Sequence, residues 1–280
     1  MKIRLWGTRG SIPAPGPSTV RYGGNTSCVE VRLDDGTLII VDAGSGIRPL
    51  GAAIGACTGT LLLTHYHWDH IQGLPFFTPA YMEGSAINII GPEFEGQGPA
   101  EYLGAQMMTP FFPAPPSQLQ GIESFRVTPQ EPFAVGSARV RAARLSHPDV
   151  TYGYRIEADG SVFVYMSDNE PAVAEPEIAP GFVELARDAD ILLHDCQFND
   201  QEYLSCRYWG HSTPAQAVGV ARAADARRLL LFHHAPAHTD EQVEALAEEA
   251  RRISGEIEIL IGREGETHNM TITSAIMRII

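Results

Sequence analysis

The chain has 280 residues, 44% of them hydrophobic, which is enough apolar surface for one large core. Its formal net charge is −14, so it lacks the basic surface of a general nucleic-acid-binding protein. This charge does not exclude a small phosphate ester held by bound metal, because local charge in a site can oppose the field of the whole protein. No linker-like or low-complexity tract divides the sequence, so we expect residues 1–280 to form a single domain.

The sequence shows no sign of export or membrane insertion. The segment MKIRLWGTRGSIP lacks the longer apolar stretch of a secretion signal. No run approaches the roughly 18 apolar residues that a membrane span requires. The 4 cysteines show no CxxC pairing and are typical of thiols in a reducing compartment. These features predict a cytoplasmic protein without a membrane partner.

Short β-branched and aliphatic runs recur along the whole chain and predict many strands. The segments 152–157 and 162–166 are joined through ADG, which is typical of a hairpin, so the sheets are expected to be mixed. We expect strands at 2–6, 28–33, 38–41, 60–64, 87–90, 139–145, 152–157, 162–166, 191–194, 229–232, 257–261 and 270–273.

Helical patterns are clearest in the second half of the chain. The segment 212–226 begins with a Ser/Thr cap and a proline in the first turn, followed by Ala/Val periodicity. The segment 239–253 has Thr239 as its N-cap, acids in its first turn and arginines at its end, which matches the helix dipole. GFVELARDA is a weaker helical pattern. Strands interspersed with helices predict a layered α/β protein.

The segment near 108–121 contains four prolines between Pro110 and Pro116, which excludes a helix interior or a central strand. Phe111 and Phe112 lie among these prolines. One interpretation is a rigid surface loop with its rings turned inward. The other is a lid or dimer contact that presents the two rings near a ligand.

Five apolar runs are each followed by histidine or aspartate, and parallel strands present their carboxyl ends at the same edge of a sheet. We therefore expect these side chains to meet. Any one of them could be an ordinary turn residue, but five coincidences favour a metal site, because bound metal removes the cost of burying such groups. The residues are His65, His67, Asp69 and His70 after the first run, then His147, Asp168, Asp195, and finally His233 with His234.

The spacing within HYHWDH favours two metal ions. His65 and His67 are two apart, so in an extended segment they point to the same side and can share one ion. Asp69 and His70 follow where the chain turns toward a helix and can serve a second ion nearby. Imidazole and carboxylate ligands without thiolate suit Zn²⁺, and Mn²⁺ or Fe²⁺ also fit.

HYHWDH reads as H-x-H-x-D-H and resembles the signature of the metallo-β-lactamase superfamily. The resemblance runs from GTRGSIP through IIVDAG to the last histidines, and so covers nearly the whole chain. It implies an αββα fold, a four-layer sandwich of two mixed sheets with the metals at one edge. The implied ligands are His65, His67 and His147 for one ion, Asp69, His70 and His233 for the other, and Asp168 as a bridge. Asp42 would orient a ligand histidine, and His234 is the alternative to His233.

LLHDCQF and GHSTPAQAVGVA are similar to segments of the tRNase Z and cyclic-phosphodiesterase branch of this family. The resemblance implies that His211, paired with Asp195, protonates the leaving oxygen, and that Asp69 also belongs to the catalytic set. This chain has Asp195 where the branch has glutamate. Only 21 positions separate His147 from Asp168, so the tRNA-gripping arm of tRNase Z is missing.

The resemblance therefore implies a phosphodiesterase that attacks a small cyclic or linear phosphodiester, of cyclic-nucleotide type, with a metal-bridging hydroxide. It further implies a homodimer that forms no stable nucleic-acid complex. A lactonase with the same metal ligands is the alternative, although the Asp195–His211 pair has no obvious task there. A metal-stabilised binding protein or sensor is a third hypothesis. A diiron redox role is weaker, because flavin-linked members carry glutamate where this chain has His67.

Overall fold

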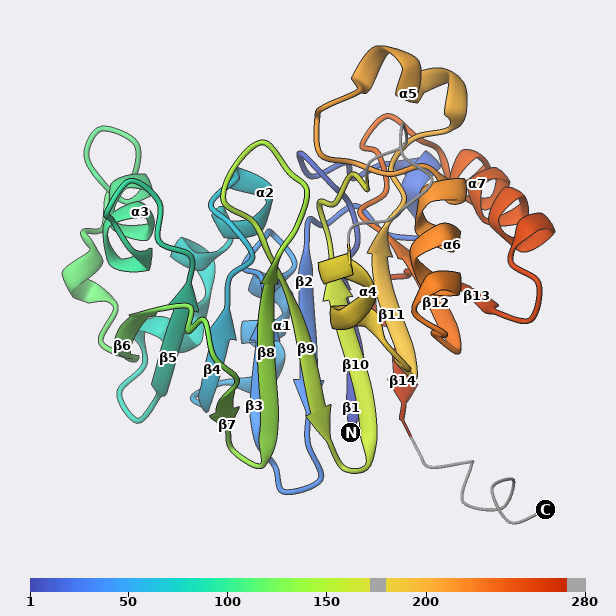
Figure 1. The fold of residues 1–280 in the computed structure, drawn as a ribbon. Helices are drawn as coiled ribbons and strands as arrows, with labels where there is room; N and C mark the ends of the chain where they lie inside the picture. Colours follow the sequence, from blue (N-terminus) through green and yellow to red (C-terminus); the bar gives the residue numbers. More distant parts are fainter. Residues whose placement is uncertain (172–179, 271–280) are drawn as a thin grey trace.

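The computed structural model describes residues 1–171 and 180–270. Within these residues the strands form two seven-stranded sheets that face each other (Figure 1). The first sheet has the order β14 (Thr267–Asn269), β1 (Lys2–Gly7), β2 (Cys28–Arg32), β3 (Leu38–Val41), β4 (Thr58–Leu62), β5 (Ala86–Gly91), β6 (Ile122–Val127). The second has the order β13 (Glu258–Ile261), β12 (Arg228–Phe232), β11 (Ile191–Asp195), β10 (Ser161–Met166), β9 (Tyr152–Ala158), β8 (Ala138–Arg144), β7 (Phe133–Val135).

Both sheets are mixed, as the sequence predicts. In the first sheet β1, β2 and β3 pair antiparallel, whereas β3 to β6 run parallel. In the second sheet β7 to β10 pair antiparallel, and β10 to β13 run parallel. The hairpin of β9 and β10 is confirmed by the register Tyr165↔Tyr154. The parallel strands therefore end at one edge of each sheet, where their following residues can meet.

Helices cover the outer face of each sheet and complete the four layers (Figure 1). Apolar residues between the two sheets form the central core, including Tyr154, Phe163 and Phe232, and each fully buried side chain of this size contributes about 1.5–3 kcal/mol. The first sheet carries α1 (Ile47–Ile54) and α3 (Pro99–Gln106), and the second carries α4 (Pro180–Ala186), α6 (Pro214–Ala223) and α7 (Asp240–Ile253). The predicted αββα sandwich is thus confirmed.

Most predicted elements are found with ends shifted by one or two residues. The predicted N-cap is confirmed, because the Thr239 side chain accepts a hydrogen bond from the Gln242 amide at the start of α7. Two strands, β6 and β7, were not predicted; β6 is a half-exposed edge strand with charged residues, and β7 has only 3 residues. Of the predicted strand 270–273, residues 271–273 lie outside the described residues. The described strand just before it in sequence is β14. No described helix is long and apolar enough to cross a membrane.

Candidate metal centre

The strand ends beside the interface of the two sheets carry sharp backbone reversals. Asp42 follows β3, Asp168 follows β10 and His233 follows β12, and their φ angles are 63°, 53° and 57°. Left-handed backbone is uncommon outside glycine, although Asp and His tolerate it better than most residues. Such strain concentrates at functional sites, where the surrounding structure holds it. Here it turns three polar side chains out of the strand direction and into one region.

The first cluster consists of His65, His67 and His147, whose ligand nitrogens lie within 4.8 Å of one another. The Nδ1 atoms of His65 and His147 lie 3.0 Å from the hydroxyls of Thr64 and Thr151, respectively. These contacts leave the opposite Nε2 atoms free to face the shared space. His67 is the extended N-cap of the short helix α2 (Trp68–Ile71), which places it beside His65 as the spacing predicted.

Two atoms of this cluster show that the residues suit a metal ion. The Nε2 atoms of His65 and His147 are buried and have no hydrogen-bond partner among the described residues. Burying such an atom without a partner costs free energy, which a bound cation would offset. Burial also lowers the pKa of His147 to about 4, so the ring stays neutral and its nitrogen lone pair is available to a metal.

The second cluster consists of Asp69, His70, Asp168 and His233, all buried, with ligand atoms within 4.8 Å of one another. His70 Nε2 lies 3.0 Å from Asp168 Oδ2, and His233 Nε2 lies 3.1 Å from Asp69 Oδ2. Burial opposes ionisation of Asp168, yet the charges of His233 and His70 hold the pKa of this carboxyl well below its usual range. Imidazole and carboxylate together form the ligand type that Zn²⁺, Mn²⁺ and Fe²⁺ accept.

Polar groups outside the two clusters orient the ligands. Asp42 Oδ2 lies 2.8 Å from His70 Nδ1, which is the orienting role that the sequence resemblance implies. Three similar contacts were not predicted. Gln197 Oε1 lies 3.0 Å from His233 Nδ1, the Ser11 amide donates to Asp69 Oδ2 at 2.6 Å, and Asp149 Oδ2 lies 2.8 Å from His67 Nε2.

The structure distinguishes His233 from its neighbour His234. The side chain of His233 joins the second cluster, whereas His234 Nε2 lies 2.9 Å from the carbonyl oxygen of Gly262. Gly10 leaves the space for the His233 ring, because a Cβ at this position would lie 2.4 Å from it. The fully buried Arg9 donates to the carbonyl oxygens of Ala235 and His238 and so ties the chain after His233 to the loop before Ser11.

The predicted pair of Asp195 and His211 is close enough to act together. His211 Nδ1 lies 2.7 Å from Asp195 Oδ2, so the shorter aspartate reaches the ring. Burial disfavours the charged imidazole, but the carboxylates of Asp195, Asp168 and Asp69 outweigh it and raise the pKa of His211 to about 9. Thr213, not His211, caps α6 by accepting from the Gln216 amide.

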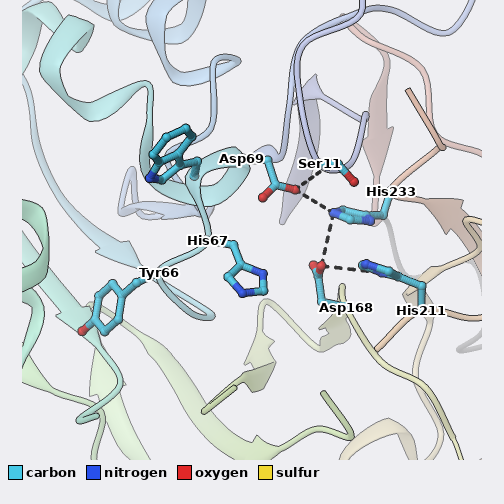
Figure 2. Close-up of a pocket in the computed structure, with 8 residues that line it drawn as sticks. Ser11, Tyr66, His67, Asp69, Asp168, His211 and His233 are labelled. Atoms are coloured by element: carbon cyan, nitrogen blue, oxygen red, sulfur yellow. Dashed lines mark hydrogen bonds and ion pairs between the residues drawn. The ribbon is translucent and has the colours of Figure 1, made fainter. Parts of the chain in front are cut away.

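A pocket of about 400 Å³ opens onto these groups (Figure 2). In Figure 2, Asp69 and His233 face each other across a dashed contact, and dashed contacts join Asp168 to both His233 and His211. Phe111 is exposed and Phe112 packs edge-on against Phe76, and neither ring lines the pocket in this chain. The pocket is lined by Ser11, Tyr66, His67, Trp68, Asp69, Asp168, His211 and His233.

Glu170 is a further residue that sequence reasoning missed. Its buried carboxylate accepts hydrogen bonds from the Tyr203 hydroxyl at 2.6 Å, the Tyr208 amide at 2.9 Å and the Gly210 amide at 2.8 Å. Gly210 in turn packs against His147, since a Cβ there would lie 2.1 Å from the His147 ring. Glu170 therefore holds the loop that leads into His211.

We expect Glu170→Gln to destabilise the protein by about 1–3 kcal/mol, because the new amide group would face a donor inside a buried site. Equilibrium denaturation in urea measures this change. Glu83→Gln removes an exposed carboxylate and serves as the matched control, with an expected change within about 0.5 kcal/mol. Identical midpoints for the two variants would show that Glu170 does not stabilise the loop.

Comparisons with known proteins agree with this fold. A model described as Beta-lactamase superfamily domain matches residues 38–234, more than half of the chain. The ribonuclease Z of Mycobacterium marinum is 30% identical over 293 residues, covering 92% of this chain and 95% of that protein. The metallo-beta-lactamase fold protein YhfI from Bacillus subtilis superposes with a TM-score of 0.72 at 21% identity, covering 95% of this chain and 98% of YhfI. A diphosphatase from the PhnP family gives a TM-score of 0.70 at 18% identity, with 96% and 98% covered.

The sandwich fold and the His/Asp cluster at its edge, together with the family match and these relatives, indicate a metal-dependent hydrolase. The chain belongs to the metallo-β-lactamase superfamily. Within this superfamily it belongs to the tRNase Z-like branch.

Proposed function

We propose that this hydrolase is a phosphodiesterase that cleaves a small cyclic or linear phosphodiester of the cyclic-nucleotide type. The observation that carries the proposal is the position of His211. It lines the same pocket as Asp69 and Asp168, and its ring is hydrogen-bonded to Asp195. A hydrolase acting on a good leaving group needs no such proton donor. A ribose hydroxyl leaves poorly, and a positioned acid accelerates its departure.

The site residues would hold two divalent ions, Zn²⁺ in the first instance, with Mn²⁺ or Fe²⁺ as alternatives. His65, His67 and His147 would bind one, Asp69, His70 and His233 the other, and Asp168 both. When bound, the ions would neutralise the charge of the phosphate oxygens and lower the pKa of a bound water molecule.

The remaining steps belong to the chain itself. Asp195 fixes the His211 ring through Nδ1, so the other ring nitrogen is left to give a proton to the leaving oxygen. Gln197 and Asp42 fix the rings of His233 and His70 in the same way, and thereby keep their second nitrogens directed to the ligand cluster.

Two features support a small substrate over a structured RNA. The interval between His147 and Asp168 is filled by the hairpin of β9 and β10, where the resemblance places the RNA-gripping arm of tRNase Z. None of the residues that line the described pocket is lysine or arginine, and the chain carries a net charge of −14. An RNA backbone is normally held by such basic groups.

RNA cleavage is the second candidate, and it is favoured by the similarity to the ribonuclease Z of Mycobacterium marinum. A substrate panel on the metal-loaded protein separates the two. We expect a kcat/KM of about 10⁴ M⁻¹ s⁻¹ or more for a 2′,3′- or 3′,5′-cyclic nucleotide, a ribose 1,2-cyclic phosphate or a linear diester. Precursor tRNA and a homoserine lactone are expected to give much lower values.

Faster cleavage of precursor tRNA than of the small diesters would establish a nuclease. Faster opening of the lactone would establish the alternative lactonase activity. Activity on none of the panel would favour a binding protein or sensor.

Two further proposals concern assembly: the chain forms a homodimer, and the loop at 108–121 closes over the pocket of its own chain or of its partner. To close over the pocket of its own chain, this loop would have to move, because neither Phe111 nor Phe112 lines the pocket.

A further inference from the structure

Trp68 is the most exposed residue of the HYHWDH segment, more exposed than the side chain of its neighbour His67. The side chains of Asp69 and His70 turn inward in α2 and are buried, whereas the side chain of Trp68 is 78% exposed. Single apolar residues on a surface are ordinary. Trp68, however, lines the pocket, and both of its neighbours in sequence are residues of the two ligand clusters. The short backbone segment that carries these ligands therefore also places Trp68 at the rim of the pocket.

Trp68 is also free to take a partner, in contrast to the other aromatic residue of the pocket. The ring of Tyr66 stacks on Tyr102 with centroids 4.5 Å apart, and its hydroxyl donates to the Pro92 carbonyl oxygen. Figure 2 shows Tyr66 pointing away from the cluster. The indole of Trp68 has no ring contact and no hydrogen bond within the described part of the chain, whereas its backbone carbonyl accepts from the Gln72 amide. Most of this large π-system is thus exposed beside the ligand clusters, with no ring of the described residues against it.

Apart from Tyr66, the other pocket residues would serve the proposed metal ions and the phosphate. Ser11 donates its amide to Asp69, and the remaining members are the histidines and carboxylates of the ligand clusters together with His211. None of them offers apolar surface to the part of a substrate that does not react. We propose that Trp68 determines specificity by stacking on a planar ring of the substrate, so that the preferred substrate is a small phosphodiester that carries a nucleobase.

This inference rests on the proposed function, and a pair of substrates with the same reacting phosphate tests it. Adenosine 2′,3′-cyclic phosphate carries a base, whereas methyl ribofuranoside 2,3-cyclic phosphate does not. Stacking of one base on an aromatic side chain corresponds to roughly 5- to 100-fold in affinity. We therefore expect the metal-loaded protein to show a KM lower by roughly this factor for the adenosine compound.

Trp68→Ala is expected to remove the preference by raising the KM for the adenosine compound alone, with little change in kcat for either substrate. Trp68→Phe should keep part of the preference because it keeps an aromatic face, and Trp68→Leu should lose most of it. Tyr208→Ala is the matched control, since Tyr208 is 85% exposed and does not line the pocket. Equal KM values in the wild-type protein, or a preference that survives Trp68→Ala, would overturn the inference.

A binding experiment separates failure of this inference from failure of the proposed function. Calorimetric titration of the metal-loaded protein with adenosine 5′-monophosphate and with ribose 5-phosphate requires no turnover. Tighter binding of the adenosine compound that disappears in Trp68→Ala supports the stacking site even if no phosphodiester is hydrolysed. Hydrolysis without any preference for the base upholds the phosphodiesterase and refutes the stacking. A preference dependent on Trp68 that is confined to a single-stranded RNA hexanucleotide would overturn the assignment to a small nucleotide.

Discussion

Replacement of Asp168 by alanine is expected to weaken binding of both metal ions, whereas His65→Ala should lose mainly one. The carboxylate of Asp168 lies 3.0 Å from His70 Nε2 and 3.3 Å from His233 Nε2, and its charge also acts on His65. Asp168 would therefore help to hold the ion of the second cluster, and the resemblance assigns it to the first ion as well, whereas the imidazole of His65 would bind only one. Because bound metal accounts for several kcal/mol of transition-state stabilisation, Asp168→Ala should lower kcat/KM by roughly 10³-fold or more.

Elemental analysis of the purified variants, with kcat/KM on the preferred diester, measures both effects. Asp149→Ala is the matched control, because the Asp149 carboxylate contacts the ring of His67 but belongs to neither ligand cluster. Removal of such an outer carboxylate reduces metal affinity by only about 10- to 100-fold. A wild-type protein that holds a single tight ion, or an Asp168→Ala variant that keeps two, would contradict the bridging assignment.

His211→Ala is expected to slow hydrolysis of an alkyl or ribose phosphodiester by roughly 10²–10⁴-fold and to slow a nitrophenyl phosphodiester far less. The ribose oxygen needs a proton as its bond to phosphorus breaks, whereas nitrophenolate leaves without one. Asp195→Asn should give the same selectivity in weaker form, because Asp195 orients the ring through a 2.7 Å contact and does not itself transfer the proton.

Metal content should stay unchanged in the His211 variant, and this separates proton donation from metal binding. His238→Ala is a suitable control, since His238 is a buried histidine that bonds to Glu202 and does not line the pocket. The change in hydrolysis rate caused by His238→Ala should not depend on the leaving group of the substrate. Equal losses on the two substrates, or loss of metal in His211→Ala, would assign His211 to binding of phosphate or metal.

The sequence alone determined the layered fold and the candidate metal ligands. Strand and helix periodicity are local properties of a chain, and a helix cap such as Thr239 needs only its own first turn. The His and Asp residues were found because each follows an apolar strand, and parallel pairing brings such strand ends together without further information. The same logic failed for β6, whose exposed and charged residues at a sheet edge carry no clear alternation.

The tertiary structure decided which polar groups surround the ligands. Ser11 reaches Asp69 across 58 positions, Gln197 reaches His233 across 36, and Glu170 reaches Gly210 across 40, so no local pattern could predict these pairs. The choice between His233 and His234 likewise depended on a backbone reversal at φ 57° and on the space left by Gly10. The outward position of Trp68 follows from how α2 packs, because this short helix buries its two polar residues, Asp69 and His70, toward the sheets.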